Sequence, residues 1–276
     1  MTNLTDWIGR ATELSCWLDP WRARALHATL DSTEPIPKEG SALAPGWHWT
    51  YFLDTTGSSE LGPDGHPRRG EFMPPVELPH RMWAGSRIEF LASLELGESA
   101  TRVSRILAVE EKSGRSGRLC FVTVEHETRG RSGVAIREQQ DIVYRDAAAG
   151  GAAAPQPAPN DAKWRREWSF DAPRLFRYSA LTFNSHRIHY DREYATKQEG
   201  YPGLVVHGPL LATLMLELVR AHHPNRPLLG FEFRAVAPVF EDQRIEACGK
   251  PAGDRIDVWI RGGAGSLHQR GSVVLG

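Results

Sequence analysis

A short apolar segment in the last third of the chain sets the strongest limit on its fold. Residues 210–216 read Leu-Leu-Ala-Thr-Leu-Met-Leu, and no charge follows until Glu217. A helix that is apolar nearly all round has to be buried, because it has no face for water. It is also too short to cross a membrane, which takes about 20 apolar residues. We therefore predict a buried helix that begins at Gly208 and is wrapped by other elements.

The chain just before this helix is polar and rich in histidine. Residues 184–191 read Asn-Ser-His-Arg-Ile-His-Tyr-Asp, and His207 stands immediately before Gly208. A polar turn close to a helix N-terminus can bring an acid/base side chain to backbone N–H donors. We therefore look for the functional site within residues 176–220.

Two sets of predicted strands accompany the helix. The strands of the first set are predicted at residues 86–94, 101–109, 119–125 and 134–144. Glycine- and serine-rich turns join the last three of them into an antiparallel meander. Those of the second set are predicted, partly from alternation of apolar and polar residues, at 231–239, 244–249, 255–261 and 266–275. Each set is expected to form its own antiparallel sheet, and a sheet wrapped around a helix gives an α+β fold.

Other segments have weaker signals. Residues 3–30 read as helical, with Asp19-Pro20 opening a second helix. The aromatic run at 47–52 is typical of a strand. Residues 55–70 form a long loop, and loops of this length are often functional. Three prolines exclude a long helix at 72–84, so the first set of strands has no helix equivalent to the one at Gly208.

A low-complexity stretch divides the chain near its middle. Residues 146–163 are rich in alanine, proline and glycine, which predicts a linker. We call residues 1–145 the first half and residues 164–276 the second half, and expect each to be a domain. A chain of 276 residues is long enough for two cores of about 130 residues.

Composition excludes several classes of function. The formal net charge is −1, which gives no case for nucleic acid or an acidic membrane surface. The three cysteines are far apart and show neither metal-ligand spacing nor a disulfide framework. The N-terminal residues lack a basic region followed by an apolar run, so we predict no signal peptide and a cytoplasmic location.

The second half resembles the MaoC-like (R)-specific enoyl-CoA hydratases, which have a hot-dog fold. Their motif reads Asp-x-Asn-Pro-x-His, followed further on by His-Gly at the start of the central helix. Here Asn184 stands for the Asp, His186 for the Asn and Arg187 for the Pro, while His189 keeps the position of the catalytic histidine. The sequence His-Gly recurs at Gly208.

The first half resembles the degenerate N-terminal hot dog of the type 2 hydroxyacyl-thioester dehydratases, which include mesaconyl-C4-CoA and itaconyl-CoA hydratases. Residues 78–85, Leu-Pro-His-Arg-Met-Trp-Ala-Gly, carry this likeness. The resemblance covers nearly the whole chain and implies a double hot-dog monomer that usually dimerises. It implies that the missing helix of the first half opens room for a bulkier acyl group. No cofactor is implied, because CoA is part of the substrate.

Three residues are predicted to carry the chemistry of hydration. His189 suits proton transfer, because an unperturbed histidine has a pKa of about 6.5. The backbone N–H of Gly208, at a helix N-terminus, suits the negative charge that builds on the thioester oxygen. Asn184 cannot take up a proton, but its side-chain carbonyl can accept a hydrogen bond from water.

Four further residues are predicted to contact the substrate: Arg81, His186, His207 and Arg234. Arg81 is our candidate for binding a substrate carboxylate, although either arginine could instead bind CoA phosphates or be structural. His186 could take the role of the missing carboxylate, and His207 could be no more than the residue before the helix. His186 and His189 with Asp191 give only a weak metal-binding signal, so we predict no metal.

These observations favour a hydro-lyase that reversibly hydrates a branched C5 dicarboxylic acyl-CoA, itaconyl-CoA or mesaconyl-C4-CoA, to citramalyl-CoA. One alternative is a 3-hydroxyacyl-thioester dehydratase acting on straight-chain acyl groups. Another is a non-catalytic hot dog that binds acyl-CoA. We expect an acyl-CoA substrate and a homodimer, with no nucleic acid and no membrane as partners.

Overall fold

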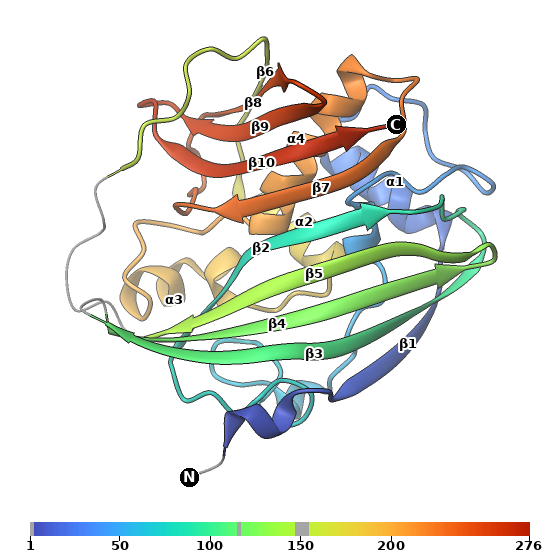
Figure 1. Ribbon diagram of the computed structural model, residues 1–276. Helices are drawn as coiled ribbons and strands as arrows, with labels where there is room; N and C mark the ends of the chain where they lie inside the picture. Colours follow the sequence, from blue (N-terminus) through green and yellow to red (C-terminus); the bar gives the residue numbers. More distant parts are fainter. Residues whose placement is uncertain (1–2, 115–116, 147–154) are drawn as a thin grey trace.

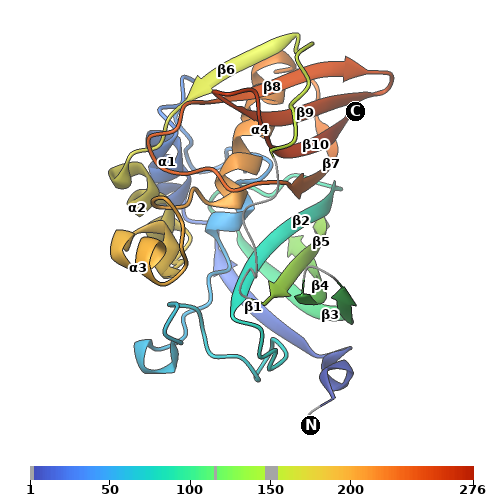
Figure 2. The ribbon, with the colours of Figure 1, turned by 90° about the vertical axis from the view of Figure 1, so that its left-hand side faces the viewer.

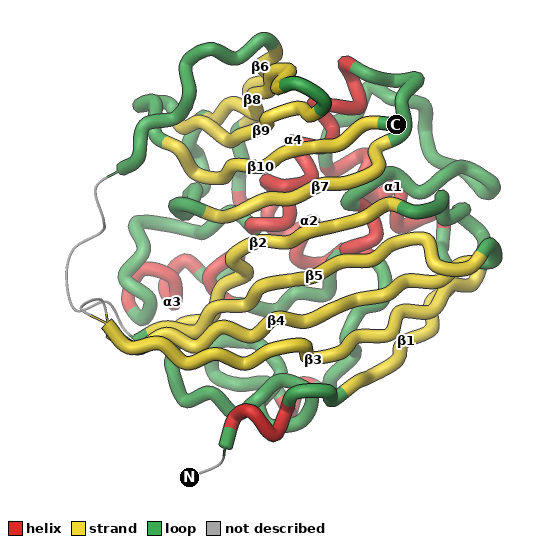
Figure 3. Tube along the Cα trace, in the orientation of Figure 1, coloured by secondary structure: helices red, strands yellow, loops and turns green. Residues whose placement is uncertain are grey.

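Ten antiparallel strands form one twisted sheet within the described residues, which are 3–114, 117–146 and 155–276 of this computed structural model (Figure 1, Figure 3). The first half contributes β1 (Ala11–Trp17), β2 (His80–Phe90), β3 (Ser99–Gly114), β4 (Gly117–Gly130) and β5 (Gly133–Arg145). The second half contributes β6 (Trp164–Trp168), β7 (Leu228–Ala235), β8 (Ile245–Ala252), β9 (Arg255–Gly262) and β10 (Leu267–Leu275). Across the sheet the order is β1-β3-β4-β5-β2-β7-β10-β9-β8-β6.

The two halves meet where β2 pairs with β7. The register runs from Gly85 opposite Arg234 to Glu89 opposite Gly230. Our expectation of a separate sheet in each half is therefore corrected. Either strand alone would leave a row of unpaired backbone groups at a sheet edge, and pairing them removes both edges. The predicted meander is confirmed, since β3 pairs with β4 and β4 with β5.

The predicted buried helix is confirmed as α4 (Gly208–His222). All its residues from Leu210 to Val219 are buried, and it packs against β8, β9, β10 and β6. Figure 2 shows α4 on the same side of the sheet as α1 (Pro20–Thr29), α2 (Ala172–Leu181) and α3 (Arg192–Lys197). Among the described residues, no helix is both long and apolar enough to cross a membrane.

Two predictions of local structure in the first half are wrong. Residues 3–30 are not helical throughout: a 3₁₀ turn at Leu4–Trp7 and α1 flank the strand β1, which pairs with β3. Leu14 and Cys16 of β1 pack on the core with the period of two that marks a strand. The aromatic run is a 3₁₀ turn at Trp47–Thr50, entered through Gly46 with φ of 85°.

The linker lies partly outside the described residues, at 147–154. On either side of it, the sequence did not anticipate β6, α2 and α3, nor that β2 begins at His80. The prediction that prolines exclude a long helix at 72–84 is confirmed, since the described chain is irregular there until β2 begins.

A buried carboxylate lies on the sheet of the first half. Glu138 of β5 accepts hydrogen bonds from His48 Nε2 (3.2 Å), Trp49 Nε1 (3.1 Å) and Ser86 Oγ (2.7 Å). Burial acts to raise the pKa of Glu138, but the hydrogen bonds from His48 and Ser86 and the charges of His48 and His126 together outweigh it and hold that pKa at about 2. The carboxylate therefore stays ionised, as a buried charge with hydrogen-bond partners can.

The junction between the halves leads to a prediction about Gly85. A Cβ atom at this position would lie 2.2 Å from the carbonyl oxygen of Phe233. Gly85→Ala should therefore lower the free energy of unfolding by about 2 kcal/mol or more, because the β2–β7 pairing must separate. Urea denaturation followed by circular dichroism measures this loss.

Gly263→Ala is the matched control, because its Cβ would meet its nearest neighbour, the Arg244 carbonyl, at an ordinary 3.6 Å. Equal stability of the two variants would contradict a tight junction.

Candidate active site

The histidine-rich turn is shaped by its own side chains. The Asn184 side-chain carbonyl accepts a hydrogen bond from the backbone N–H of His186 at 3.0 Å, and Asp191 accepts one from the N–H of Tyr194 at 3.0 Å to cap α3. Between them, Arg187–His189 forms a 3₁₀ turn. His186 and His189 are consequently buried on the inner side of the turn.

His189 is held in one neutral form. Its Nδ1 lies 2.7 Å from the carbonyl oxygen of Val205, which can only accept, so Nδ1 carries the proton and Nε2 the lone pair. Burial lowers the pKa of His189 to about 4, against a smaller opposing effect of that hydrogen bond. Near neutral pH the side chain is therefore a base with a free Nε2.

The start of α4 lies beside this histidine. The ring of His207 stacks on that of His189, with centroids 3.7 Å apart, and its Nε2 shares a 2.8 Å hydrogen bond with Ser179 Oγ. Apart from its chain neighbours and the backbone of its own helix, a Cβ atom built on Gly208 would meet no described atom within 4 Å. The first residue of the helix thus borders open space, where its backbone N–H can meet a ligand.

The long loop of the first half also reaches the site. The backbone N–H of Arg187 donates to the carbonyl oxygen of Asp64 at 2.9 Å, and Ser185 Oγ donates to the carbonyl of Gly65. Gly65 has φ of 87°, and a Cβ there would lie 1.9 Å from the Ser185 carbonyl oxygen. Only glycine allows this approach of two backbones.

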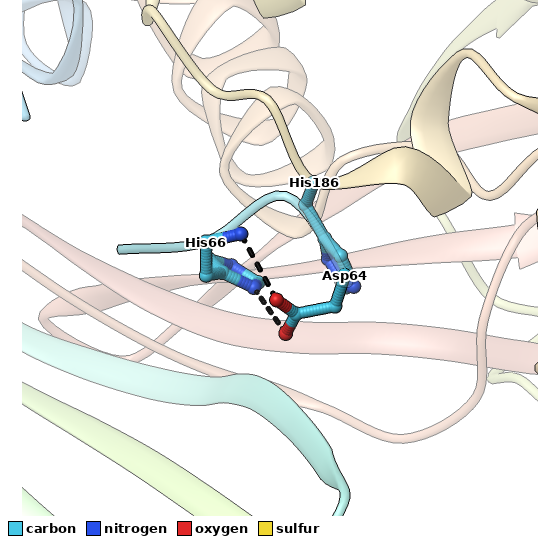
Figure 4. Close-up of side chains that lie close together, drawn as sticks. All are labelled: Asp64, His66 and His186. Carbon is cyan, nitrogen blue, oxygen red and sulfur yellow. Dashed lines mark hydrogen bonds and ion pairs between the residues drawn. The ribbon is translucent and has the colours of Figure 1, made fainter. Parts of the chain in front are cut away.

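This loop adds a carboxylate and a fourth histidine. Asp64 accepts from both the backbone N–H and Nδ1 of His66, each at 3.0 Å (Figure 4). Burial opposes ionisation of Asp64, but hydrogen bonding to His66 and its charge hold the pKa of Asp64 below the usual range. The His66 ring is 4.1 Å from that of His186, which is 5.4 Å from that of His189. We call His66, His186, His189 and His207 the histidine row.

Burial opposes a positive charge on every imidazole of the row. Desolvation is the main cause that lowers the pKa of His66, of His186 and of His207 below 6.5, and the charges of neighbouring histidines add to the effect for His186 and His207. For His66, the charge of Arg81 is the next largest cause that lowers the pKa. A ring nitrogen of such an imidazole that carries no proton can accept a proton or a hydrogen bond from a ligand.

The two predicted arginines lie on different faces of the sheet. Arg81 of β2 is close enough to lower the pKa of His66 and of His186 by charge, and it lies 6.0 Å from the Tyr144 ring. Arg234 of β7 is exposed, on the face opposite the buried Phe233. The structure therefore brings Arg81, His186, His189, His207 and Gly208 together and leaves Arg234 away from them.

Metal ligation has two possible sets of residues here. In the set that the sequence indicated, the Asp191 carboxylate already forms an ion pair with the Arg187 guanidinium, with an N–O distance of 2.7 Å. In the described residues, ligand atoms of Asp64, His66 and His186 lie within 4.8 Å of one another. Both oxygens of Asp64 already accept hydrogen bonds from His66, and the charge of Arg81 acts on this group.

Comparison with known proteins identifies the family of this chain. The family model described as hydroxyacyl-thioester dehydratase type 2 matches residues 46–241. A mesaconyl-C(4)-CoA hydratase from Chloroflexus aurantiacus is 46% identical over 276 residues, covering 98% of this chain and 97% of that protein. The chain belongs to the type 2 hydroxyacyl-thioester dehydratase family. It is a hydro-lyase of the enoyl-CoA hydratase and hydroxyacyl-thioester dehydratase type, as the sequence predicted.

Solved structures confirm the hot-dog fold. A MaoC-like dehydratase from Phytophthora capsici superposes with a TM-score of 0.72 at 13% identity, covering 100% of this chain and 98% of that one. A Mycobacterium tuberculosis protein described as having a double hotdog fold superposes with a TM-score of 0.61 at 13% identity, covering 98% and 96%. At these identities the comparison speaks for the fold alone.

Sequence reasoning missed Asp64, His66 and Ser179. The one available signal was the length of the loop at 55–70, which indicated function but not which residues carry it. Ser179 lies within α2, a helix that the sequence did not predict, so its contact with His207 had no sequence signal.

The lowered pKa of His189 predicts how stability depends on pH. In the unfolded chain this histidine takes up a proton near pH 6.5, but in the folded protein only near pH 4. Between these values the unfolded state binds more protons, so the free energy of unfolding falls as pH falls. In that window His189 contributes a slope of about 1.4 kcal/mol per pH unit.

Urea denaturation at several pH values between 5 and 7 tests this. His189→Gln should have a shallower pH dependence than the unmodified protein by about that amount, because glutamine does not titrate. Parallel pH dependences for the two proteins would refute the low pKa.

Proposed function

We propose that this protein reversibly hydrates a branched C5 dicarboxylic acyl-CoA, mesaconyl-C4-CoA or itaconyl-CoA, to citramalyl-CoA. The observation that carries the proposal is the free Nε2 of His189 beside the open space at Gly208. The 46% identity to a mesaconyl-C(4)-CoA hydratase supports the acyl group.

Hydration assigns a separate task to each group. As the water oxygen bonds to the β-carbon, the water O–H breaks and its proton moves to Nε2 of His189. The C=C electrons move toward the thioester oxygen, where the Gly208 N–H and the α4 dipole stabilise the negative charge. A preorganised donor of this kind is worth about 3 kcal/mol in other enzymes. Return of a proton to the α-carbon completes the product.

Asn184 has a narrower role than expected. Its side-chain carbonyl is already used by the His186 N–H, so its amide N–H groups remain for a ligand. They can donate to the water oxygen and hold it for attack. Asn184 thus serves as a positioning residue that also fixes the turn.

Arg81 is proposed to bind the free carboxylate of the acyl group. Among the described residues it has no carboxylate partner, while its charge acts on the histidine row. A guanidinium is well suited to a planar carboxylate. His186 and His207 are proposed to line the same space. Arg234 is exposed on the other face and is left out of the proposed site.

Finer features of the architecture also stay proposals. The first half at 1–145 and the second half at 164–276 are proposed to be the two hot-dog domains, with the long central helix only in the second. The room left by the missing helix is proposed to take the acyl group. A homodimer and a cytoplasmic location remain predictions from the sequence.

The proposed mechanism predicts unequal effects of two substitutions. His189→Ala should reduce kcat by a factor of about 10³ or more, because the base is lost. Asn184→Ala should reduce it by a smaller factor, because only positioning suffers. A spectrophotometric assay with mesaconyl-C4-CoA, itaconyl-CoA and crotonyl-CoA measures both. Near-normal turnover by His189→Ala would remove the mechanism, and activity on crotonyl-CoA alone would remove the dicarboxylic substrate.

The role of Arg81 predicts a change in substrate preference. Arg81→Gln should lower kcat/KM for the dicarboxylic acyl-CoA by a factor of about 10 to 100, while any activity on crotonyl-CoA changes little. Arg234→Gln, on the exposed face, is the matched control and should leave both values near normal. Equal losses on both substrates would argue against carboxylate binding by Arg81.

A further inference from the structure

The proposed reaction moves a proton at two places, the water oxygen and the α-carbon. The resemblance places a carboxylate at position 184, where this chain has Asn184, which cannot transfer a proton. His189 alone would then have to serve both places. The loop of the first half puts another titratable pair, Asp64 and His66, at the end of the histidine row.

We infer that His66, held by Asp64, is a second acid/base group of this active site and returns the proton to the α-carbon. This inference rests on the proposed function and deepens it. Asp64 acts through His66 and is a positioning residue.

The hydrogen-bond partners of the four imidazoles decide where an added proton would stay. Nδ1 of His189 faces a backbone carbonyl, Nε2 of His207 faces the hydroxyl of Ser179, and the ring of His186 has no hydrogen bond among the described residues. Of the row, His66 is the member whose ring bonds to a carboxylate within the described chain. An imidazolium is best stabilised beside such an anion, so His66 is the member of the row that best holds an added proton.

The orientation of His66 fits the task. Its Nδ1–H donates to Asp64 at 3.0 Å, which leaves Nε2 as the atom that exchanges a proton with a ligand. His189 has the same arrangement, with Nδ1 bonded to Val205 and Nε2 free. Two imidazoles in one row therefore present the same atom, one backed by a carbonyl and the other by a carboxylate.

Several charges face His66 from the elements around it. Asp64, from the same loop, favours the protonated form through its hydrogen bond and its charge. Burial, Arg81 of β2 and Arg69 of the loop oppose that form, and burial has the largest effect. His66 couples also to His186 and His189, whose pKa values its charge lowers. The balance gives an acid that yields its proton readily once a carbanion forms beside it.

The step balances without any further reactant. Hydration begins with His66 protonated and His189 neutral. The water proton goes to Nε2 of His189 as the oxygen–carbon bond forms, and the α-carbon takes the proton from Nε2 of His66. One proton then passes from His189 back to His66, through His186 between them or through solvent. Dehydration runs the same steps in reverse.

The test compares His66→Gln and Asp64→Asn with the unmodified protein, using whichever acyl-CoA that protein hydrates best. His66→Gln should lower the kcat for hydration by a factor of about 100. Activity of the unmodified protein should decline as pH rises through the pKa of His66, because hydration needs that proton. Asp64→Asn should move this decline to lower pH by about one unit or more, since the neighbouring anion is gone.

His80→Gln is the matched control, because His80 also pairs with a carboxylate, Glu199 at 2.6 Å, without belonging to the row. It should keep a normal rate and a normal pH profile. Asp64→Asn preserves side-chain size, so it decides the matter if His66→Gln fails to fold. A rate for His66→Gln within a factor of three of normal, or an unmoved pH profile for Asp64→Asn, would overturn the inference while leaving the hydratase function intact.

Two other outcomes separate this inference from its rivals. An unmodified protein that is inactive on mesaconyl-, itaconyl- and crotonyl-CoA would overturn the proposed function itself. Zinc chloride titration supplies the second outcome. Tight binding of one zinc ion per chain that both variants lose, together with activity abolished by a chelator, would assign the cluster to a metal and overturn the proton role.

Discussion

The backbone pairing of β2 with β7 fixes how the two halves of this protein meet. It makes one sheet from the strands of both halves and sets the distance between the loop at 55–70 and the turn at 184–191. At Gly65 and Ser185 the backbone of the loop is in direct contact with the backbone of the turn. The geometry of the histidine row depends on this pairing, because His66 comes from one half and the other three histidines from the second.

At the histidine row, the requirements of stability and of function conflict. Three of these imidazoles are buried and His66 is partly buried, and desolvation lowers the pKa of all four, so a charge on any of them is unfavourable. A protein interior that minimised this cost would use apolar side chains instead. Retaining the row is typical of an active site, where local rules of burial give way to chemistry.

Much of the second half could be predicted because its signals are local. The uncharged run from Leu210 predicted α4 before any contact was known, and the matching position of His189 pointed to the residue that we propose as the base. The first half was harder. We predicted a helix over the residues of β1 because their alternation of apolar and polar side chains is short. Trp47–Thr50 forms a turn because Gly46 has φ of 85°, a backbone conformation that aromatic composition does not reveal.

The partners of the site could not be predicted for a different reason. His66 lies 120 residues before His186 in the chain, and no local pattern links a loop to a turn at such a separation. The joining of the halves into one sheet was missed on the same ground, since strand pairing between distant segments leaves no trace in the period of either strand. Long-range contacts, and not local propensities, determine both the position of His66 beside His186 and the joining of the halves into one sheet.

The Asp64–His66 pair has a consequence for the modularity of the chain. The second half holds the buried helix, His189 and Gly208, and so has the outline of a self-sufficient enzyme. Yet the Asp64–His66 pair, whose imidazole lies 4.1 Å from that of His186, belongs to the first half, and so does the strand that covers the edge of β7. If the pair takes part in the chemistry as proposed, neither half can form the complete site alone, and a substitution in one half can change the pKa of a histidine in the other.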